Sequence, residues 1–320
     1  MHFSVSAVDV AEMTGGYVAL REHAAWVDLS TRGKIRATGE DRARLLHAMT
    51  TNQVEQLRPG EGCYAFFLNA QGRILGDVNL LCFEEHFLLD TEPETRRKLF
   101  DHLDRYIIAD DVTIEDETDH VTTIAVEGPD AAAVLSRLGA LIPEKPHAWA
   151  AWDSRTVARL NTTGSEGFFV FTSAADKAEL ISRLSAAGAV AASADDARTV
   201  RIEHGRPRYG EEITERRLVQ ETAQLHAVHF SKGCYLGQEI VERVRSRGQV
   251  HRVLRRLEIN SSKVPAPGTK LAAGDGEAAE IASAVFSPAL DETVALAYVR
   301  VQYAERGTEL SWNDVKVCVS

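Results

Sequence analysis

The sequence has few cysteines and no long apolar segment. Its four cysteines, at positions 63, 82, 234 and 318, include no Cys-x-x-Cys pair, so neither a disulfide framework nor a zinc ribbon is expected. No apolar run is long enough to cross a bilayer. The first 25 residues lack the basic start and apolar core of a secretory signal, and Asp9, Glu12 and Glu22 argue against a transit peptide. We therefore expect a cytoplasmic protein without membrane contact.

Basic residues are outnumbered by acidic ones. The 320 residues include 36 Lys and Arg against 47 Asp and Glu, giving a net charge of -11. This balance disfavours nonspecific binding to nucleic acid or anionic membranes. One local exception is a cluster of six arginines: Arg243, Arg245, Arg247, Arg252, Arg255 and Arg256. The cluster could receive an anionic ligand, or it could be a solvated surface neutralised by Glu239, Glu242 and Glu258.

Helical and strand patterns alternate without the repetition of a parallel barrel, which predicts the α+β class. Apolar spacing predicts helices at 41–49, at 130–138, at 176–187 and, after Pro93, around Leu99, Leu103 and Tyr106. Strands are predicted at 63–68, 74–83, 122–126 and 168–171, and the first two are joined by the turn residues Asn69 to Gly72. Residues 189–194 are expected to form a loop, and Cys63 and Cys82 to lie in the core.

Beyond residue 250 the pattern changes to short segments broken by proline and glycine. Alternating apolar residues at 294–299 and 310–319 predict strands of a small β-barrel. We therefore place a domain boundary near residue 250, with residues 251–320 as the barrel.

A short segment sets one cysteine between two glycines, followed by a carboxamide and a carboxylate: Lys232, Gly233, Cys234, Tyr235, Leu236, Gly237, Gln238 and Glu239. Lys232, together with a helix start near Gln238, would favour the reactive thiolate of Cys234. The structural alternative is that the two glycines form a turn and Cys234 fills a small buried space.

His226, His229 and Cys234 have the chemistry of metal ligands. The sequence supplies no fourth ligand beside them, and one cysteine cannot hold a conventional iron–sulfur cluster on a single chain. No resident metal is expected.

The segment from Lys232 to Glu239 resembles the signature of the YgfZ-type folate-binding proteins, relatives of the aminomethyltransferase (T-protein) of the glycine cleavage system. Further landmarks that look like those of the T-protein superfamily follow in the expected order, at residues 28–34, 50–52, 68–77, 200–205 and 287–299. The resemblance implies two α+β units within residues 1–250 and a terminal barrel, arranged around a central pocket for tetrahydrofolate or a one-carbon derivative.

The resemblance also implies site residues. In T-proteins an aspartate after the hairpin turn orients the folate and takes part in catalysis; Asp77 stands at that position, with Tyr64 in the same pocket. Arg201 stands where the family has a folate-contacting arginine. Glu203 follows it by two, so both would lie on one face of an extended segment and bind folate. The alternative for Arg201 and Glu203 is an ordinary structural ion pair.

Two positions depart from the T-protein pattern. Phe169 stands where that family has a glutamate that holds the pterin ring, and Glu166 would replace it only in a shifted register. Cys234 stands where T-proteins have an acidic residue. These changes favour the YgfZ-type role, an accessory protein that binds tetrahydrofolate and assists assembly or repair of iron–sulfur clusters in client enzymes, with Cys234 as the key thiol. The alternative is a folate-dependent aminomethyltransferase with Asp77 as the acid–base group.

Overall fold

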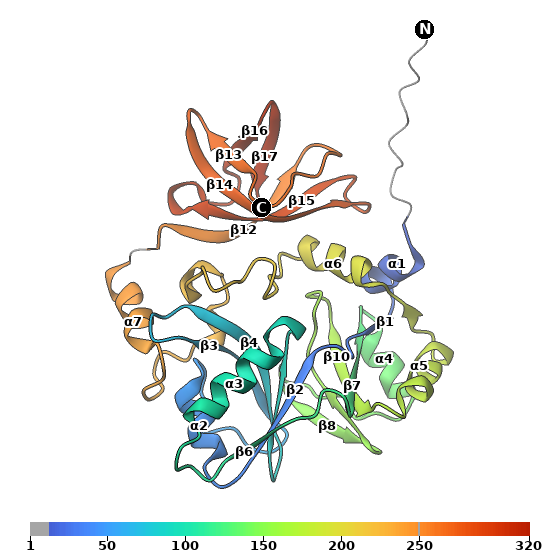
Figure 1. The fold of residues 1–320 in the computed structure, drawn as a ribbon. Coiled ribbons are helices and arrows are strands. Elements are labelled where there is room, and N and C mark those ends of the chain that lie inside the picture. The colour runs from blue at the N-terminus through green and yellow to red at the C-terminus, as the bar shows by residue number, and fades with distance from the viewer. Residues whose placement is uncertain (1–12, 249) are drawn as a thin grey trace.

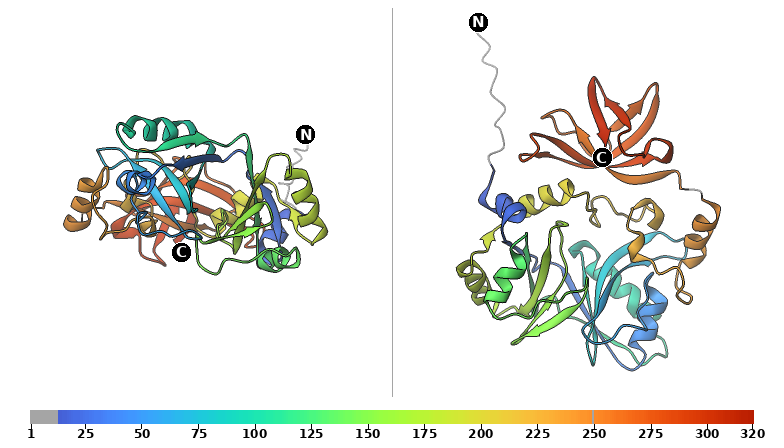
Figure 2. Two further views of the ribbon diagram at one scale, coloured as in Figure 1. Left: turned by 90° about the horizontal axis from the view of Figure 1, so that it is seen from below. Right: turned by 180° about the vertical axis from the view of Figure 1, so that it is seen from behind.

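The computed structural model describes residues 13–248 and 250–320, and its strands form three sheets. Two open sheets lie side by side, and a closed barrel of six strands lies at one end of the pair (Figures 1 and 2). The predicted α+β class with a C-terminal barrel is confirmed. In the part of the chain that the structure describes, no helix combines the length and apolar character needed to cross a membrane.

The first sheet contains the hairpin that was predicted around Gly72. Its strand order is β3-β4-β5-β2-β6, and all neighbouring pairs are antiparallel. The strands are β2 (Gly33–Thr38), β3 (Gly62–Leu68), β4 (Ile74–Cys82), β5 (Phe87–Thr91) and β6 (Thr113–Asp116). Gly72 closes the turn between β3 and β4 with a φ of 68°, a left-handed conformation that glycine adopts without strain.

Two helices pack on this sheet, α2 (Arg42–Met49) and α3 (Arg96–Tyr106). Leu46 of α2 and Leu99 and Leu103 of α3 share one core with the sheet, which also contains Cys63 and Cys82. Tyr106, the third apolar position predicted for α3, is 38% exposed because it ends the helix at the margin of this core.

The second sheet has the order β11-β1-β7-β10-β9-β8. Its strands are β1 (Ala25–Asp28), β7 (Val121–Glu127), β8 (Trp149–Trp152), β9 (Arg155–Ala158), β10 (Gly167–Ser173) and β11 (Val190–Ala191). Helices α4 (Ala131–Arg137) and α5 (Lys177–Ala186) pack on one face through Leu135 and Leu180. Helix α1 (Gly15–Glu22) belongs to a different core, in which Tyr17 and Leu20 pack with Phe169.

A short connection joins the two sheets. Strand β1 ends at Asp28 in the second sheet, and β2 begins at Gly33 in the first. Residues 29–32 therefore pass directly from one sheet to the other.

The segment expected to be extended around Arg201 is mostly helical, so this prediction was wrong. Helix α6 runs from Ala194 to Glu203. The Ser193 hydroxyl accepts a hydrogen bond from the backbone N–H of Asp196 at 3.1 Å, and the Asp196 carboxylate accepts one from the Ser193 N–H at 2.8 Å. This capping box stabilises a helix start at the end of the alanine-rich stretch that was expected to be a loop.

The closed barrel has the order β12-β15-β14-β13-β16-β17. Its strands are β12 (Arg252–Ile259), β13 (Lys270–Ala273), β14 (Gly276–Ser287), β15 (Glu292–Arg300), β16 (Glu309–Trp312) and β17 (Val315–Val319). Helix α6 packs on the barrel through Ile202, which contacts a core containing Leu254 and Tyr298. The remaining elements are α7 (Gln238–Arg247) and four short 3-10 turns, η1 (Pro93–Thr95), η2 (Val219–Glu221), η3 (Leu225–Ala227) and η4 (Val301–Tyr303).

Candidate functional site

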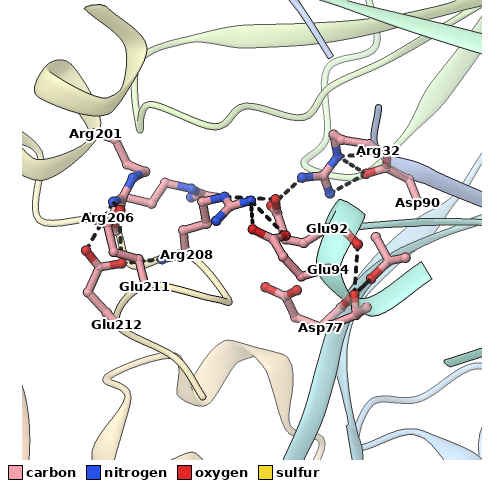
Figure 3. Close-up of polar contacts among 12 residues, drawn as sticks. Arg32, Asp77, Asp90, Glu92, Glu94, Arg201, Arg206, Arg208, Glu211 and Glu212 are labelled. Carbon is pink, nitrogen blue, oxygen red and sulfur yellow. Dashed lines mark hydrogen bonds and ion pairs between the residues drawn. The ribbon is translucent and has the colours of Figure 1, made fainter. Parts of the chain in front are cut away.

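A cavity of about 360 Å³ lies where the two sheets and helix α6 meet. Its walls come from four stretches of chain that are distant in sequence, within residues 27–32, 64–93, 161–169 and 194–211, together with Gln224. The volume falls in the range of small-ligand pockets. Figure 3 shows its polar walls, with Arg32, Asp77 and Glu92 on one side and Arg201, Arg206 and Arg208 on the other.

Asp77 projects from β4 into this cavity. In the β3–β4 register Asp77 faces Phe66 and Asn79 faces Tyr64, so Asp77 and Tyr64 are diagonal neighbours on one face of the sheet. The Tyr64 hydroxyl donates a hydrogen bond to Oδ2 of Asp77 at 2.7 Å. The other carboxylate oxygen, Oδ1, is buried and has no hydrogen-bond partner among the described residues. Asp77 therefore presents one fixed and one free oxygen.

The environment of Asp77 alters its proton affinity. Burial is the main reason that its pKa is raised to about 6, and the negative charge of Glu92 adds to the shift. The Tyr64 hydrogen bond and the positive charge of Arg32 act in the opposite direction. Burial also raises the pKa of Tyr64 well above its ordinary value, so the phenol keeps its proton and remains a donor to Asp77.

A chain of ion pairs between arginines and acidic residues lies in the cavity wall near Asp77. Arg32 binds Asp90 through Nε at 2.9 Å and Nη2 at 2.7 Å, and it also pairs with Glu92. Arg208 reaches Glu92 at 2.9 Å and Glu94 at 2.7 Å from the opposite wall. Because Glu92 accepts from both walls, this network connects the first sheet to the segment after α6.

Phe169 lines the cavity at the position where the sequence resemblance placed a pterin-binding carboxylate. The Arg32 guanidinium lies 5.6 Å from the centre of its ring. Glu166 is bound to Arg159 at 2.8 Å and is not part of the wall. The wall around Phe169 therefore offers an aromatic ring in place of a carboxylate.

Of the two residues predicted to bind folate together, Arg201 and Glu203, only Arg201 lines the cavity. Arg201 lines the cavity, but its guanidinium is bound to Glu212 at 2.8 Å and to Glu211. Glu203 lies outside the cavity, where its carboxylate accepts hydrogen bonds from Tyr17, Arg21 and Ser287. The expectation that both share one face was wrong, because residues two apart in a helix point in different directions.

The segment from Lys232 to Glu239 lies outside the cavity wall. Lys232 is buried, and its ammonium donates hydrogen bonds to the carbonyl oxygens of His47 at 2.5 Å and of Thr50 and Asn52 at 2.7 Å. Burial lowers its pKa to about 8. The ammonium is thus occupied by backbone oxygens, and the expected pairing of Lys232 with Cys234 is not observed.

Cys234 is exposed to solvent, which contradicts the alternative in which it fills a buried space. Gly233 and Glu239 are exposed as well, whereas Tyr235 is buried against the hairpin core. Helix α7 begins at Gln238 as expected, and Gly237 caps it with a φ of 85°. The Gln238 side chain accepts a hydrogen bond from the Tyr235 N–H at 3.3 Å. The segment thus holds an exposed thiol on an anchored turn.

Neither the two histidines His226 and His229 nor the arginine cluster lines the cavity. His226 stacks on Tyr64 with ring centres 5.5 Å apart. Residues 13–248 and 250–320 contain no group of three or more His, Cys, Asp or Glu side chains that could hold a metal ion. None of the six clustered arginines lines the cavity, and three of them pair with acidic neighbours: Arg245 with Glu242, Arg252 with Glu277 and Glu280, and Arg256 with Glu258.

Several cavity residues were missed by sequence reasoning, above all Arg32, Glu92, Arg206 and Arg208. A signal was present in two short patterns, Glu92-Pro-Glu94 and Arg206-Pro-Arg208: the first sets two acidic residues around a proline, and the second sets two basic ones. Their complementarity could be recognised only once the fold had brought them together.

Comparisons with known proteins cover nearly the whole chain. The GCVT N-terminal domain matches residues 10–232, and the glycine cleavage T-protein C-terminal barrel domain matches residues 252–313. An aminomethyltransferase of Rubrobacter xylanophilus is 31% identical over 91% of this chain and 80% of its own length. A putative chloroplast transferase of Arabidopsis thaliana is 28% identical over 89% of this chain and 67% of its own length.

The fold agrees with a solved structure as well. The crystal structure of the glycine cleavage system aminomethyltransferase T from Bartonella henselae superposes with a TM-score of 0.86, at 22% identity, over 95% of this chain and 87% of that one. The two family matches, the order of the sheets and the terminal barrel agree with one another. The chain belongs to the aminomethyltransferase superfamily, with a GCVT N-terminal domain and a T-protein C-terminal barrel.

Proposed function

We propose that the cavity binds tetrahydrofolate or a one-carbon derivative, with Oδ1 of Asp77 facing the nitrogen that carries the one-carbon unit. The observation that carries the proposal is this buried carboxylate oxygen, which has no hydrogen-bond partner in residues 13–248 and 250–320. A buried acceptor without a partner is costly, and a ligand N–H group would satisfy it. The cavity's volume and the family of the chain support a ligand of this class.

Asp77 has suitable properties for moving a proton to or from such a nitrogen. With a pKa of about 6, the carboxyl group exists in both protonation states near neutral pH. Tyr64 occupies Oδ2, so the proton exchanges at Oδ1. Tyr64 and Asp77 line the cavity, which supports the roles assigned to them by resemblance. Arg201 lines it too, but its guanidinium is held by Glu211 and Glu212.

For the reaction itself, the names of the curated relatives support aminomethyl transfer more directly than any role with iron–sulfur clusters. In this candidate function Asp77 is the acid–base group that assists transfer of the one-carbon unit to or from folate.

A second candidate is the YgfZ-type accessory function in iron–sulfur cluster assembly or repair. Two features of this chain favour it. Cys234 is an exposed thiol on an anchored turn outside the cavity, where a client enzyme could reach it. Phe169 provides no carboxylate for the pterin ring at the position where aminomethyltransferases use one.

Calorimetric titration with tetrahydrofolate, on the wild type and on Cys234→Ala and Asp77→Asn, tests folate binding. We expect saturable binding to the wild type that Cys234→Ala leaves unchanged and Asp77→Asn weakens. No saturable binding to the wild type would overturn the proposal.

Two activity assays separate the candidate reactions. Aminomethyl transfer predicts turnover in a reconstituted glycine cleavage reaction that Asp77→Asn abolishes and Cys234→Ala spares. The accessory function predicts that Cys234→Ala fails to restore iron–sulfur enzyme activity in a deletion strain although its folate affinity is intact.

A further inference from the structure

Five arginines line the cavity: Arg32, Arg198, Arg201, Arg206 and Arg208. Four of them are neutralised by carboxylates. Arg32 binds Asp90, Arg198 and Arg201 bind Glu211, and Arg208 binds Glu94. Within residues 13–248 and 250–320, the guanidinium of Arg206 alone among the five has no hydrogen-bond or ion-pair partner.

The backbone of Arg206 is nevertheless held firmly. Its N–H donates to the carbonyl oxygen of Arg201 at 3.0 Å, and its own carbonyl accepts a hydrogen bond from the Arg201 guanidinium at 2.6 Å. Pro207 follows, and Arg208 is anchored to Glu92 and Glu94. The side chain of Arg206 thus projects from a fixed point while all five of its donors stay available.

The charge of Arg206 influences the protonation of three aromatic side chains, Tyr64, His147 and His226. Burial lowers the pKa of His226, and the positive charge of Arg206 lowers it further. Burial likewise lowers the pKa of His147 to about 4, with smaller contributions from His226 and Arg206. Burial raises the pKa of Tyr64, and Arg206 partly opposes this shift. The charge of Arg206 is thus felt by Tyr64 and by His226, which stacks on it, while no carboxylate among the described residues forms an ion pair with the guanidinium.

We propose that Arg206 binds a carboxylate of the ligand in the cavity, namely one on the glutamate tail of the folate. The inference rests on the proposed folate binding. A planar guanidinium with five free donors can bind a carboxylate through two parallel hydrogen bonds. The ligand carboxylate would then be the negatively charged partner that the other four arginines find within the protein. Arg201, which the resemblance implies as a folate contact, then acts as a positioning residue that holds the backbone of Arg206.

The test titrates two ligands into three proteins, with a fourth protein, the Arg206→Lys variant, as a rescue control. Wild type, Arg206→Met and Arg243→Met are titrated with tetrahydrofolate and with 6-methyltetrahydropterin, which lacks the benzoylglutamate tail. Arg243 is an exposed member of the outer arginine cluster, so its variant removes the same charge outside the cavity. Thermal unfolding verifies that both variants fold, and Arg206→Lys tests partial rescue by a single positive charge.

We expect Arg206→Met to weaken tetrahydrofolate binding by about tenfold or more, the loss of a charge-assisted hydrogen bond, and to leave 6-methyltetrahydropterin binding unchanged. Arg243→Met should alter neither. Equal weakening of both ligands would overturn the tail assignment, and so would tail-dependent weakening in Arg243→Met. If p-aminobenzoylglutamate alone fails to compete in the wild type while glycine competes, the carboxylate belongs to a second substrate and the tail assignment fails. A wild type that binds neither pterin overturns the proposed function itself.

Discussion

The carboxyl group of Asp77 is buried in the folded protein, and burial disfavours its ionised form. Its pKa lies at about 6, compared with 3.8 for an unperturbed aspartate, because burial destabilises the ionised form. The folded protein therefore binds this proton more tightly than the unfolded chain does. The favourable contribution is complete below about pH 4 and is lost as the pH rises through about 6.

Asp77→Asn should consequently stabilise the protein under mildly alkaline conditions while impairing its function. The amide keeps an acceptor for the Tyr64 hydroxyl and removes the buried charge. We expect a gain of about 1–3 kcal/mol in the free energy of unfolding near about pH 8. Urea denaturation across a pH series measures it, and the gain should disappear near about pH 4, where the wild-type carboxyl is protonated. A gain independent of pH would contradict the assigned pKa.

The placement of the site residues was predictable from the sequence only where it follows from a local motif. Asp77 and Tyr64 lie in one hairpin, so strand alternation brings them to the same face. Arg206 and Glu92 belong to segments separated by more than a hundred residues, and no local pattern could have paired them with the cavity. Lys232 was assigned to its sequence neighbour Cys234, but tertiary structure directs its ammonium to carbonyl oxygens around residue 50.

Helix α7 depends on the glycine at its first cap. A Cβ atom on Gly237 would lie 2.6 Å from the carbonyl oxygen of Asn69 and 2.9 Å from Cβ of Leu68, besides requiring a left-handed backbone. Gly248, at the other end of the same helix, is also left-handed but has nothing within 4 Å of that position. An alanine at Gly248 would therefore introduce backbone strain alone, whereas an alanine at Gly237 would add a steric clash.

Gly237→Ala should cost about 2–4 kcal/mol of stability, combining left-handed strain with overpacking. Gly248→Ala should cost about 1 kcal/mol, from backbone strain alone. Thermal unfolding of the two variants measures the difference. Equal losses would show that the approach of α7 to the β3–β4 turn is looser than described.

Among the elements, hairpins and amphipathic helices were predictable because their signals are local. The β3–β4 turn contains its own glycine, and α3 shows its buried positions at helical spacing. Helix α6 was missed because its alanine-rich start resembles a linker, and its stability depends on packing against the barrel and α1. Only the Ser193 to Asp196 capping box marked its beginning.

At the scale of the whole molecule, Glu203 connects three parts of the chain. Its carboxylate binds Tyr17 and Arg21 of α1 and the Ser287 hydroxyl of the barrel at 2.6 Å. Burial, with Glu203 adding to it, raises the pKa of Tyr17 to about 12, so the phenol remains a donor. Its spacing from Arg201 in an expected strand had assigned Glu203 to the ligand, but its contacts attach the barrel to the rest of the protein.

Glu203→Ala should therefore lower the free energy of unfolding by about 2–4 kcal/mol, because it leaves buried donors without an acceptor. Glu309→Ala, which breaks an exposed pair with Lys316, serves as the control and should have little effect. Limited proteolysis should also cleave the Glu203 variant faster between the sheets and the barrel. Comparable stability of both variants would remove Glu203 from this role.

The architecture as a whole was more predictable than the cavity. The α+β fold class and the C-terminal β-barrel could be predicted from patterns within single segments and from the family resemblance across the chain. The cavity wall is assembled from four distant stretches, so its composition depends on how the sheets meet, which no segment encodes alone.

Residues 29–32, which join β1 to β2, have a mechanical consequence. So few residues can span only about 14 Å even when fully extended, and Arg32 at their end is tied to Asp90 of one sheet and packed over Phe169 of the other. We therefore expect the two sheets to stay together at this edge of the cavity, where the short link and the two contacts of Arg32 hold them. On this expectation the cavity keeps nearly the same width when a ligand enters, and the radius of gyration in solution should hardly change on binding.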